Sequence, residues 1–274
     1  MASSKVVYYL PDSANPFWRE VVAGIERKMA AFGLAFETVS AGHDPTLQLG
    51  QLNECLQSRP DGIFVSPVDM DSVSAPCRAI GRAGIPVIGI DQAMTGSTTA
   101  NVIAGNMKGG YLAAHHLAAS LAAGKGIVHV EAEDLPNVAL RRKSFVAEAA
   151  RQGLQIIKTI QADSSRQKAC AGMNQFLTEK RRFDGVFAEN DAMALGVIDA
   201  LDSAAYSPWP VIVGFDGVKE ALEAIRAGRM HATVAQNPGL LGEKAAEVMM
   251  EVMAKRPVEI TTSVLPTLIT RRDA

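Results

Sequence analysis

The 274-residue chain is predicted to fold as an α/β protein with two lobes, each a doubly wound parallel sheet covered by helices on both faces. Short β-rich apolar runs alternate with segments whose apolar residues recur at helical spacing. Several runs are hydrophobic at every position, which is typical of parallel strands buried on both faces. The rhythm breaks near residues 95–105, 235–242 and 265–266, and these breaks are predicted to be three hinge crossings between the lobes.

The three crossings divide the sequence into two lobes of ordinary domain size. They place residues 1–103 and 238–264 in an N-terminal lobe and residues 104–237 and 265–274 in a C-terminal lobe. The predicted strands are 6–10, 35–39, 62–65, 87–90, 127–130, 155–160, 185–188, 211–214 and 232–235. The clearest predicted helices are 17–32, 107–123, 140–152 and 192–201.

Composition argues against several classes of function. The net charge is −2 and no basic run is present, so a nucleic-acid partner has no electrostatic support. Three widely spaced cysteines fit neither a disulfide framework nor a zinc site, and we expect buried or half-buried thiols. No segment approaches the roughly 18 consecutive apolar residues that a membrane span requires. Because no basic, apolar leader precedes the first strand, the chain is either cytoplasmic or a protein whose signal peptide has been removed.

Polar and aromatic residues follow most of the predicted strands. In open parallel sheets, ligands collect beyond the carboxyl ends of the strands, so these residues are candidates for a binding site. An Asp or Asn before a helix is commonly an N-cap, but capping explains neither an arginine, a glutamine nor two aromatic rings. The residues in question are Asp12, Asn15, Phe17, Trp18, Asp69, Asp71, Asp91, Gln92, Arg141, Asn190, Asp191, Asp216, Gln236 and Asn237.

The chemistry of this set points to a polyhydroxylated ligand. Carboxylates accept hydrogen bonds, a guanidinium donates them and side-chain amides do both, which matches hydroxyl groups. Aromatic rings offer a flat apolar surface to the C–H face of a sugar. No phosphate-binding glycine motif, nucleophile elbow or metal-ligand spacing is present, so we expect no cofactor, no metal and no catalysis.

Six motifs occur in the order seen in type I periplasmic sugar-binding proteins. They are "NPFW" at 15–18, "ID" at 90–91, "RRKSF" at 141–145, "AENDAMALG" at 188–196, "VIVGFDG" at 211–217 and "TVAQNP" at 233–238. Over nearly its full length the chain resembles the ribose-binding branch of the ABC transporter solute-binding proteins. The resemblance implies a periplasmic, monomeric protein without a reaction, whose lobes close on a sugar and which delivers it to a membrane permease. The implied ligand-binding residues are Asn15, Phe17, Trp18, Asp91, Gln92, Arg141, Asn190, Asp216 and Gln236.

The sequence departs from the ribose-binding pattern at three places. Gln92 stands where an arginine is typical, Ser164 stands where the second lobe carries an aromatic residue, and Ser144 stands where a glycine usually precedes Phe145. A pentose, a hexose and a sugar alcohol therefore stay open as ligands. Asp91, Asp216 and Arg141 sum to a charge of −1, so we expect a neutral ligand.

Two other classes of protein stay open beside a sugar-binding transport protein. They are the effector domain of a transcriptional repressor without its DNA-binding segment and, in third place, a Rossmann-like enzyme.

Overall fold

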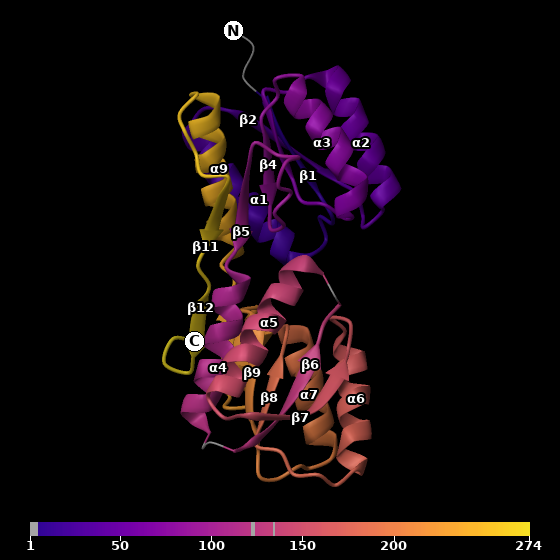
Figure 1. Ribbon diagram of the computed structural model, residues 1–274, viewed down its shortest axis with the longest axis vertical. Coiled ribbons are helices and arrows are strands. Elements are labelled where there is room, and N and C mark those ends of the chain that lie inside the picture. Colours follow the sequence, from indigo (N-terminus) through magenta and orange to yellow (C-terminus); the bar gives the residue numbers. More distant parts are fainter. Residues whose placement is uncertain (1–4, 122–123, 134) are drawn as a thin grey trace. The chain divides into compact units, whose positions relative to one another are not determined.

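A computed structural model describes residues 5–121, 124–133 and 135–274 of the chain. The chain separates into two compact units (Figure 1). The first unit comprises Met1–Ala104 and Pro238–Val264, and the second comprises Gly105–Asn237 and Leu265–Ala274. The chain thus passes between the units three times, after residues 104, 237 and 264. The sequence had placed the first of these passages after residue 103.

The first unit contains a six-stranded parallel sheet between two layers of helices. Its strand order is β2-β1-β3-β4-β5-β11. The strands are β1 (Lys5–Leu10), β2 (Ala35–Ser40), β3 (Gly62–Val65), β4 (Val87–Ile90), β5 (Ala100–Ala104) and β11 (Thr261–Val264). The helices are α1 (Pro16–Ala31), α2 (Pro45–Ser58), α3 (Met70–Arg82) and α9 (Pro238–Met253).

Strand β1 shows why the central strands of this sheet are almost wholly apolar. Val6, Tyr8 and Leu10 pack into the cluster under α1 and α9. Val7 and Tyr9 point to the opposite face and pack into the cluster under α2 and α3. Since successive side chains of a strand alternate between faces, a strand covered on both sides has no position left for a polar residue.

The second unit repeats this topology. Its strand order is β7-β6-β8-β9-β10-β12, which corresponds strand for strand to the order in the first unit. The strands are β6 (Gly126–Glu131), β7 (Gln155–Gln161), β8 (Gly185–Ala188), β9 (Val211–Asp216), β10 (Ala232–Ala235) and β12 (Thr267–Thr270). The helices are α4 (Asn106–Ser120), α5 (Pro136–Arg151), α6 (Arg166–Thr178), α7 (Asp191–Ser203) and α8 (Lys219–Arg226).

One strand corrects the prediction of wholly parallel sheets. The edge strand β12 pairs antiparallel with β10, whereas the other pairings of its sheet are parallel. A parallel connection requires a crossover of about a dozen residues or more. The chain reaches β12 only two residues after β11 ends, so it enters the sheet without a crossover helix.

The predicted strands and helices correspond to elements of the structure, and three short strands were missed. Strand β5 lies inside the break near residues 95–105, and β11 and β12 lie on either side of the break at 265–266. Helix α4 ends at Ser120, and the last two residues of the predicted helix 107–123 fall outside the described residues. Cys55 and Cys77 are buried and Cys170 is half-buried, as expected.

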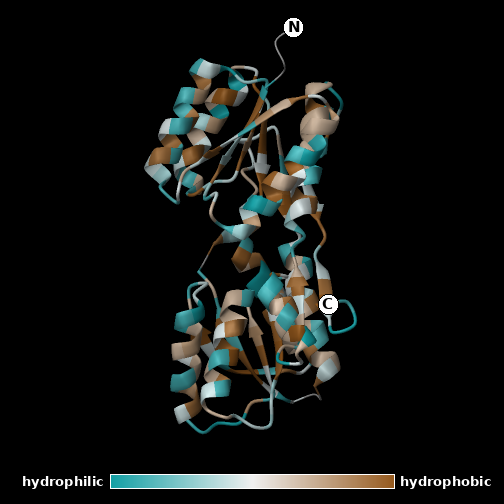
Figure 2. Ribbon diagram, turned by 180° about the vertical axis from the view of Figure 1, so that it is seen from behind, coloured by the Kyte–Doolittle hydropathy of each residue, from teal (hydrophilic) through white to brown (hydrophobic). Residues whose placement is uncertain are grey.

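Hydropathy follows this layering. The strands inside each unit are mostly hydrophobic, whereas hydrophilic and hydrophobic residues alternate along the helices (Figure 2). Within the described part of the chain, no helix has the length and apolar character needed to cross a membrane.

Glycines allow the helices within each layer to approach closely. A Cβ atom at Gly24 of α1 would lie 2.1 Å from the Gly239 carbonyl oxygen of α9. A Cβ atom at Gly110 of α4 would lie 2.1 Å from the Arg141 carbonyl oxygen of α5. Real Cβ atoms do not come this close to backbone, so these positions require glycine. The α4–α5 contact sets the position of the helix that carries Arg141.

Candidate ligand-binding residues at the strand ends

Each sheet has a topological switch point at its carboxyl edge. In the first sheet, β2 pairs with one side of β1. The next strand, β3, pairs with the other side of β1, and β4 and β5 follow outward from β3. The second sheet reverses in the same way between β6 and β8. Doubly wound sheets bind ligands outside the carboxyl ends of the strands at such points. The sequence-predicted residues lie at these two edges.

Asn15, Phe17 and Trp18 begin helix α1 directly after β1. Asn15 is the N-cap, and its Oδ1 accepts a hydrogen bond from the Phe17 backbone N–H at 2.9 Å. Pro16 occupies the first helical position, where its missing N–H costs nothing. The two rings meet edge to face, with centroids 4.9 Å apart and planes at 87°. Both are half-buried and pack against the core under α1, so an apolar face stays accessible at the carboxyl edge.

Asp91 and Gln92 follow β4 at the same edge. Asp91 has a φ of 72°, in the left-handed region that Asp tolerates better than most residues. Its backbone N–H donates to the Val102 carbonyl oxygen at 2.9 Å, which fixes this turn to β5. Beneath it the Tyr8 hydroxyl is buried against Ser66 Oγ at 2.8 Å. Burial raises the pKa of Tyr8, and the Asp91 carboxylate adds to that rise, so this phenol stays neutral.

The Gln92 side chain is half-buried, and its Oε1 atom is buried without a hydrogen-bond partner among the described residues. A buried amide oxygen without a donor is costly, and such groups commonly mark places where a ligand or water supplies the bond.

In the second unit, Arg141 is almost wholly buried, with 4% of its surface exposed. Its Nη2 and Nε atoms donate to Asn106 Oδ1 at 2.9 and 3.2 Å, and Nη1 donates to the Glu189 carbonyl oxygen. The guanidinium carbon lies 3.4 Å from the centroid of the Phe215 ring, a cation–π contact. Because these contacts tie α4, α5 and β8 together, Arg141 stabilises the fold as well as the edge, which the sequence did not predict.

Asp216 ends β9 beside Gln236, which follows β10. The Gln236 Nε2 atom donates to Asp216 Oδ1 at 2.6 Å, while its Oε1 atom is buried and has no partner within the described residues. Burial raises the pKa of Asp216, and the Arg141 guanidinium and the Gln236 hydrogen bond offset this only in part. The edge therefore holds a carboxylate whose charge is poorly compensated by the protein.

Asp191 lies next to Asp216 and has a structural role. Its Oδ2 atom accepts from the Gly217 and Val218 backbone N–H groups at 2.8 and 2.9 Å, and its Oδ1 atom accepts from the Thr233 hydroxyl at 2.7 Å. These bonds hold the turn after β9. Burial and then the Asp216 carboxylate raise the pKa of Asp191.

Asn190 caps helix α7 and also reaches the turn after β7. Its Oδ1 atom accepts from the Met193 backbone N–H at 2.8 Å, and its Nδ2 atom lies 3.5 Å from the Ser164 carbonyl oxygen. Capping thus accounts for the Asn190 Oδ1 atom but not for its Nδ2 atom.

Other strand-end residues from the sequence have local roles that explain them. Asp69 caps α3 through the Ser72 backbone N–H at 2.8 Å. Asp12 accepts from the Ala14 backbone N–H at 2.9 Å, and Asn237 donates to the Thr267 hydroxyl at 3.2 Å. Asp71 is exposed in the first turn of α3, where a negative charge favours the helix dipole.

Sequence reasoning missed Asn106, which orients Arg141, and Glu133, which follows β6. Asn106 opens a helix after β5, a strand that the sequence did not reveal. Glu133 could have been found, because it comes three residues after the predicted strand 127–130, where the other candidates lie.

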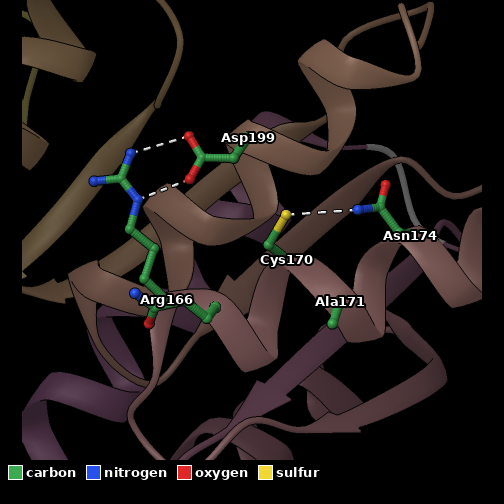
Figure 3. Close-up of a pocket in the computed structure, with 6 residues that line it drawn as sticks. Arg166, Cys170, Ala171, Asn174 and Asp199 are labelled. Carbon is green, nitrogen blue, oxygen red and sulfur yellow. Dashed lines mark hydrogen bonds and ion pairs between the residues drawn. The ribbon is translucent and has the colours of Figure 1, made fainter.

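A pocket elsewhere in the second unit is lined by none of the candidate residues at the carboxyl edges. It lies along α6 and is lined by Arg166, Gln167, Cys170, Ala171, Asn174 and Asp199. Its polar groups engage one another: Arg166 Nε pairs with Asp199 at 2.7 Å, and Asn174 Nδ2 lies 3.5 Å from Cys170 Sγ (Figure 3).

Comparison with known proteins agrees with the fold. Residues 6–257 match the family model described as a periplasmic binding protein domain. The chain belongs to this family. The ribose import binding protein of Bacillus subtilis is 32% identical over 252 residues, which cover 91% of this chain and 81% of that protein.

Two further comparisons place this periplasmic binding protein among relatives of the same kind. The D-allose-binding periplasmic protein of Escherichia coli is 26% identical over 263 residues, covering 91% of this chain and 85% of that protein. The solved structure of a periplasmic ribose ABC transporter protein from Conexibacter woesei has a TM-score of 0.93 at 22% identity, covering 99% and 93% of the two chains. At that identity the structure supports the fold alone. Relatives of this periplasmic binding protein are thus type I sugar-binding proteins.

Proposed function

We propose that this protein captures a neutral monosaccharide or sugar alcohol and delivers it to the membrane permease of an ABC transporter. The observation that carries the proposal is the chemistry of the two carboxyl edges. Each offers acceptors and donors to a ligand, and the first also offers the faces of Phe17 and Trp18. Hydroxyl groups require both kinds of partner, and sugar C–H faces pack on aromatic rings.

The nine proposed ligand-binding residues come from both units. Asn15, Phe17, Trp18, Asp91 and Gln92 belong to the first, and Arg141, Asn190, Asp216 and Gln236 to the second. One sugar contacted by both sets would favour closure of the units on it, with the three chain passages as hinges. The relatives are named as import or periplasmic binding proteins, and this supports a role in transport over the effector domain of a repressor.

The charges of the edges support a neutral ligand. Asp91 and Asp216 are acidic, and the guanidinium of Arg141 already donates to Asn106 and Glu189. A phosphate would require surplus donors of positive charge, and buried carboxylates would repel it. Family membership further supports a protein that works outside the cytoplasmic membrane, as a monomer and without a reaction.

A thermal-shift screen over pentoses, hexoses and polyols tests the proposal. A ligand present at about 100 times its Kd adds about 2.7 kcal/mol to the free energy of unfolding. We expect at least one neutral sugar or polyol to stabilise the protein, and its phosphate ester to have no effect at the same concentration. Stabilisation by the phosphate ester alone, or by none of the compounds, would contradict the proposal.

A further inference from the structure

Glu133 and Ser164 form a polar pair at the carboxyl edge of the second sheet that none of the roles above explains. Strands β6 and β7 are neighbours, and their last residues, Glu131 and Gln161, are paired in register. The two side chains stand just beyond these ends, and the Ser164 hydroxyl donates a hydrogen bond to Glu133 Oε2. Both residues are half-buried, so the carboxylate keeps access to the surroundings of the edge.

Three side chains hold the backbone of Ala132, the residue directly before Glu133. The Ala132 N–H donates to Glu189 Oε2 at 2.8 Å. The Ala132 carbonyl oxygen accepts from Arg142 Nη2 at 2.9 Å and from Gln161 Nε2 at 2.7 Å. A functional side chain is effective when its supporting groups fix it before the ligand arrives.

A buried charge cluster stands behind this support. Glu189 is fully buried and contacts His129 Nε2 at 3.1 Å and Arg142 Nε at 2.9 Å. Burial by itself would raise the pKa of Glu189, but the hydrogen bonds from His129 and Arg142 outweigh it and the pKa is lowered. Burying an ionised carboxylate is costly unless it is paired. The buried Glu189 carboxylate accepts a hydrogen bond from the Ala132 backbone N–H, and it thereby fixes the residue directly before Glu133.

The order of the strands places this pair at the far end of the proposed sugar site. Along the edge, Gln236 follows β10, Asp216 ends β9, Asn190 follows β8 and Glu133 follows β6. Adjacent strands lie about 4.8 Å apart, and β8 lies between β6 and β9. The end of β6, which Glu133 follows, is therefore about 10 Å from the strand that carries Asp216. A sugar whose ring hydroxyls bind near Asp216 would reach Glu133 with a group that projects beyond the ring.

We propose that Glu133, oriented by Ser164, accepts a hydrogen bond from an exocyclic hydroxymethyl group, so that the protein prefers a hexose to the matching pentose. The inference rests on the proposed function and specifies the ligand class. An ionised carboxylate is acceptor-only, so it requires a donor such as a hydroxyl. A pentopyranose lacks the hydroxymethyl arm and would leave this carboxylate without that ligand hydrogen bond.

Titration calorimetry with three matched pairs tests the inference. D-Allose with D-ribose, D-glucose with D-xylose, and D-galactose with L-arabinose each differ by the hydroxymethyl group alone. We expect the wild-type protein to bind the hexose of at least one pair about tenfold to a hundredfold more tightly than the pentose. Glu133→Ala should bring that ratio close to one by weakening the hexose while leaving the pentose Kd unchanged.

Three further variants separate a ligand contact from a structural role. Glu133→Gln and Ser164→Ala should give intermediate ratios, and they serve if Glu133→Ala folds poorly. Glu179→Gln is the control. Glu179 is exposed at the C-terminal end of α6, where its carboxylate pairs with Lys158 of β7, and its substitution should leave the ratio unchanged. Equal binding of pentose and hexose by the wild type, or equal weakening of both by Glu133→Ala, would overturn this inference alone. Failure of every sugar and polyol to bind would overturn the proposed function with it.

Discussion

Trp18 is the residue whose place in the structure is easiest to follow in solution. The chain has two tryptophans. Trp209 is fixed in the second unit, where its Nε1 atom donates to the Arg229 carbonyl oxygen at 2.9 Å and its ring lies 3.9 Å from the Arg229 guanidinium carbon. Trp18 stands at the carboxyl edge of the first sheet with part of its ring exposed.

We therefore expect a sugar that binds to change the tryptophan emission through Trp18. Trp209→Phe should retain the ligand-induced change, and Trp18→Phe should lose most of it. Titrating both variants with the sugar found in the screen checks this. A signal that survives Trp18→Phe in full would assign the reporter to Trp209 and remove Trp18 from the site.

Asp216 links ligand binding to stability. Its pKa is raised in the folded chain, so its ionised form is less favourable there than in the unfolded chain. The cost is absent below about pH 4, where the carboxyl is protonated in both states, and it grows as the pH rises through the folded pKa.

Asp216→Asn should accordingly make the ligand-free protein more stable, with a gain that increases from about pH 4 upward. The asparagine can still accept from Gln236, and it removes the like charge next to Asp191. Sugar affinity should fall by about tenfold to a hundredfold, because a charge-assisted hydrogen bond becomes a neutral one. Urea unfolding at several pH values measures the first effect and calorimetry the second. Lower stability of the variant at pH 8 would contradict this account.

At the scale of elements, the packing of α4 on α5 positions Arg141. A Cβ atom at Gly110 would meet the Arg141 carbonyl oxygen at 2.1 Å, so Gly110→Ala must move one helix. We expect a loss of about 1–3 kcal/mol in the free energy of unfolding and weaker sugar binding.

Gly81→Ala is the matched control for that substitution. Gly81 is exposed in α3, and a Cβ atom there meets no other atom within 4 Å. It should gain about 0.5–1 kcal/mol in stability and leave affinity unchanged. Equal stability of the two variants in chemical denaturation would show that the α4–α5 contact adapts more easily than the structure indicates.

Elements differ in how well the sequence predicts them. Buried parallel strands such as β8, with the sequence Gly-Val-Phe-Ala, are apolar at every position and stand out from their surroundings. Strands β11 and β12 lie at sheet edges and contain threonine and serine, so neither hydrophobicity nor alternation distinguishes them from a loop. Their pairing depends on partners far away in the sequence.

For the whole molecule, the strand-end rule predicted where most candidate residues lie but not what they contact. Asn15 and Asn190 follow their strands as expected, and each is also an N-cap. The sequence could not show that Arg141 is buried against Asn106 and Phe215, because that contact joins segments brought together only by the fold. Polar support behind an edge, such as Glu189 behind Ala132, is equally invisible in a linear pattern.

We propose that one neutral sugar binds to residues of both units. Titration calorimetry of that sugar into the wild-type protein, Asp91→Asn and Asp216→Asn tests this proposal, because the two residues belong to different units. Both variants should remain folded and lose affinity by about tenfold to a hundredfold, since each loses one charge-assisted hydrogen bond. Loss of affinity in only one variant, with the other indistinguishable from the wild type, would contradict the claim.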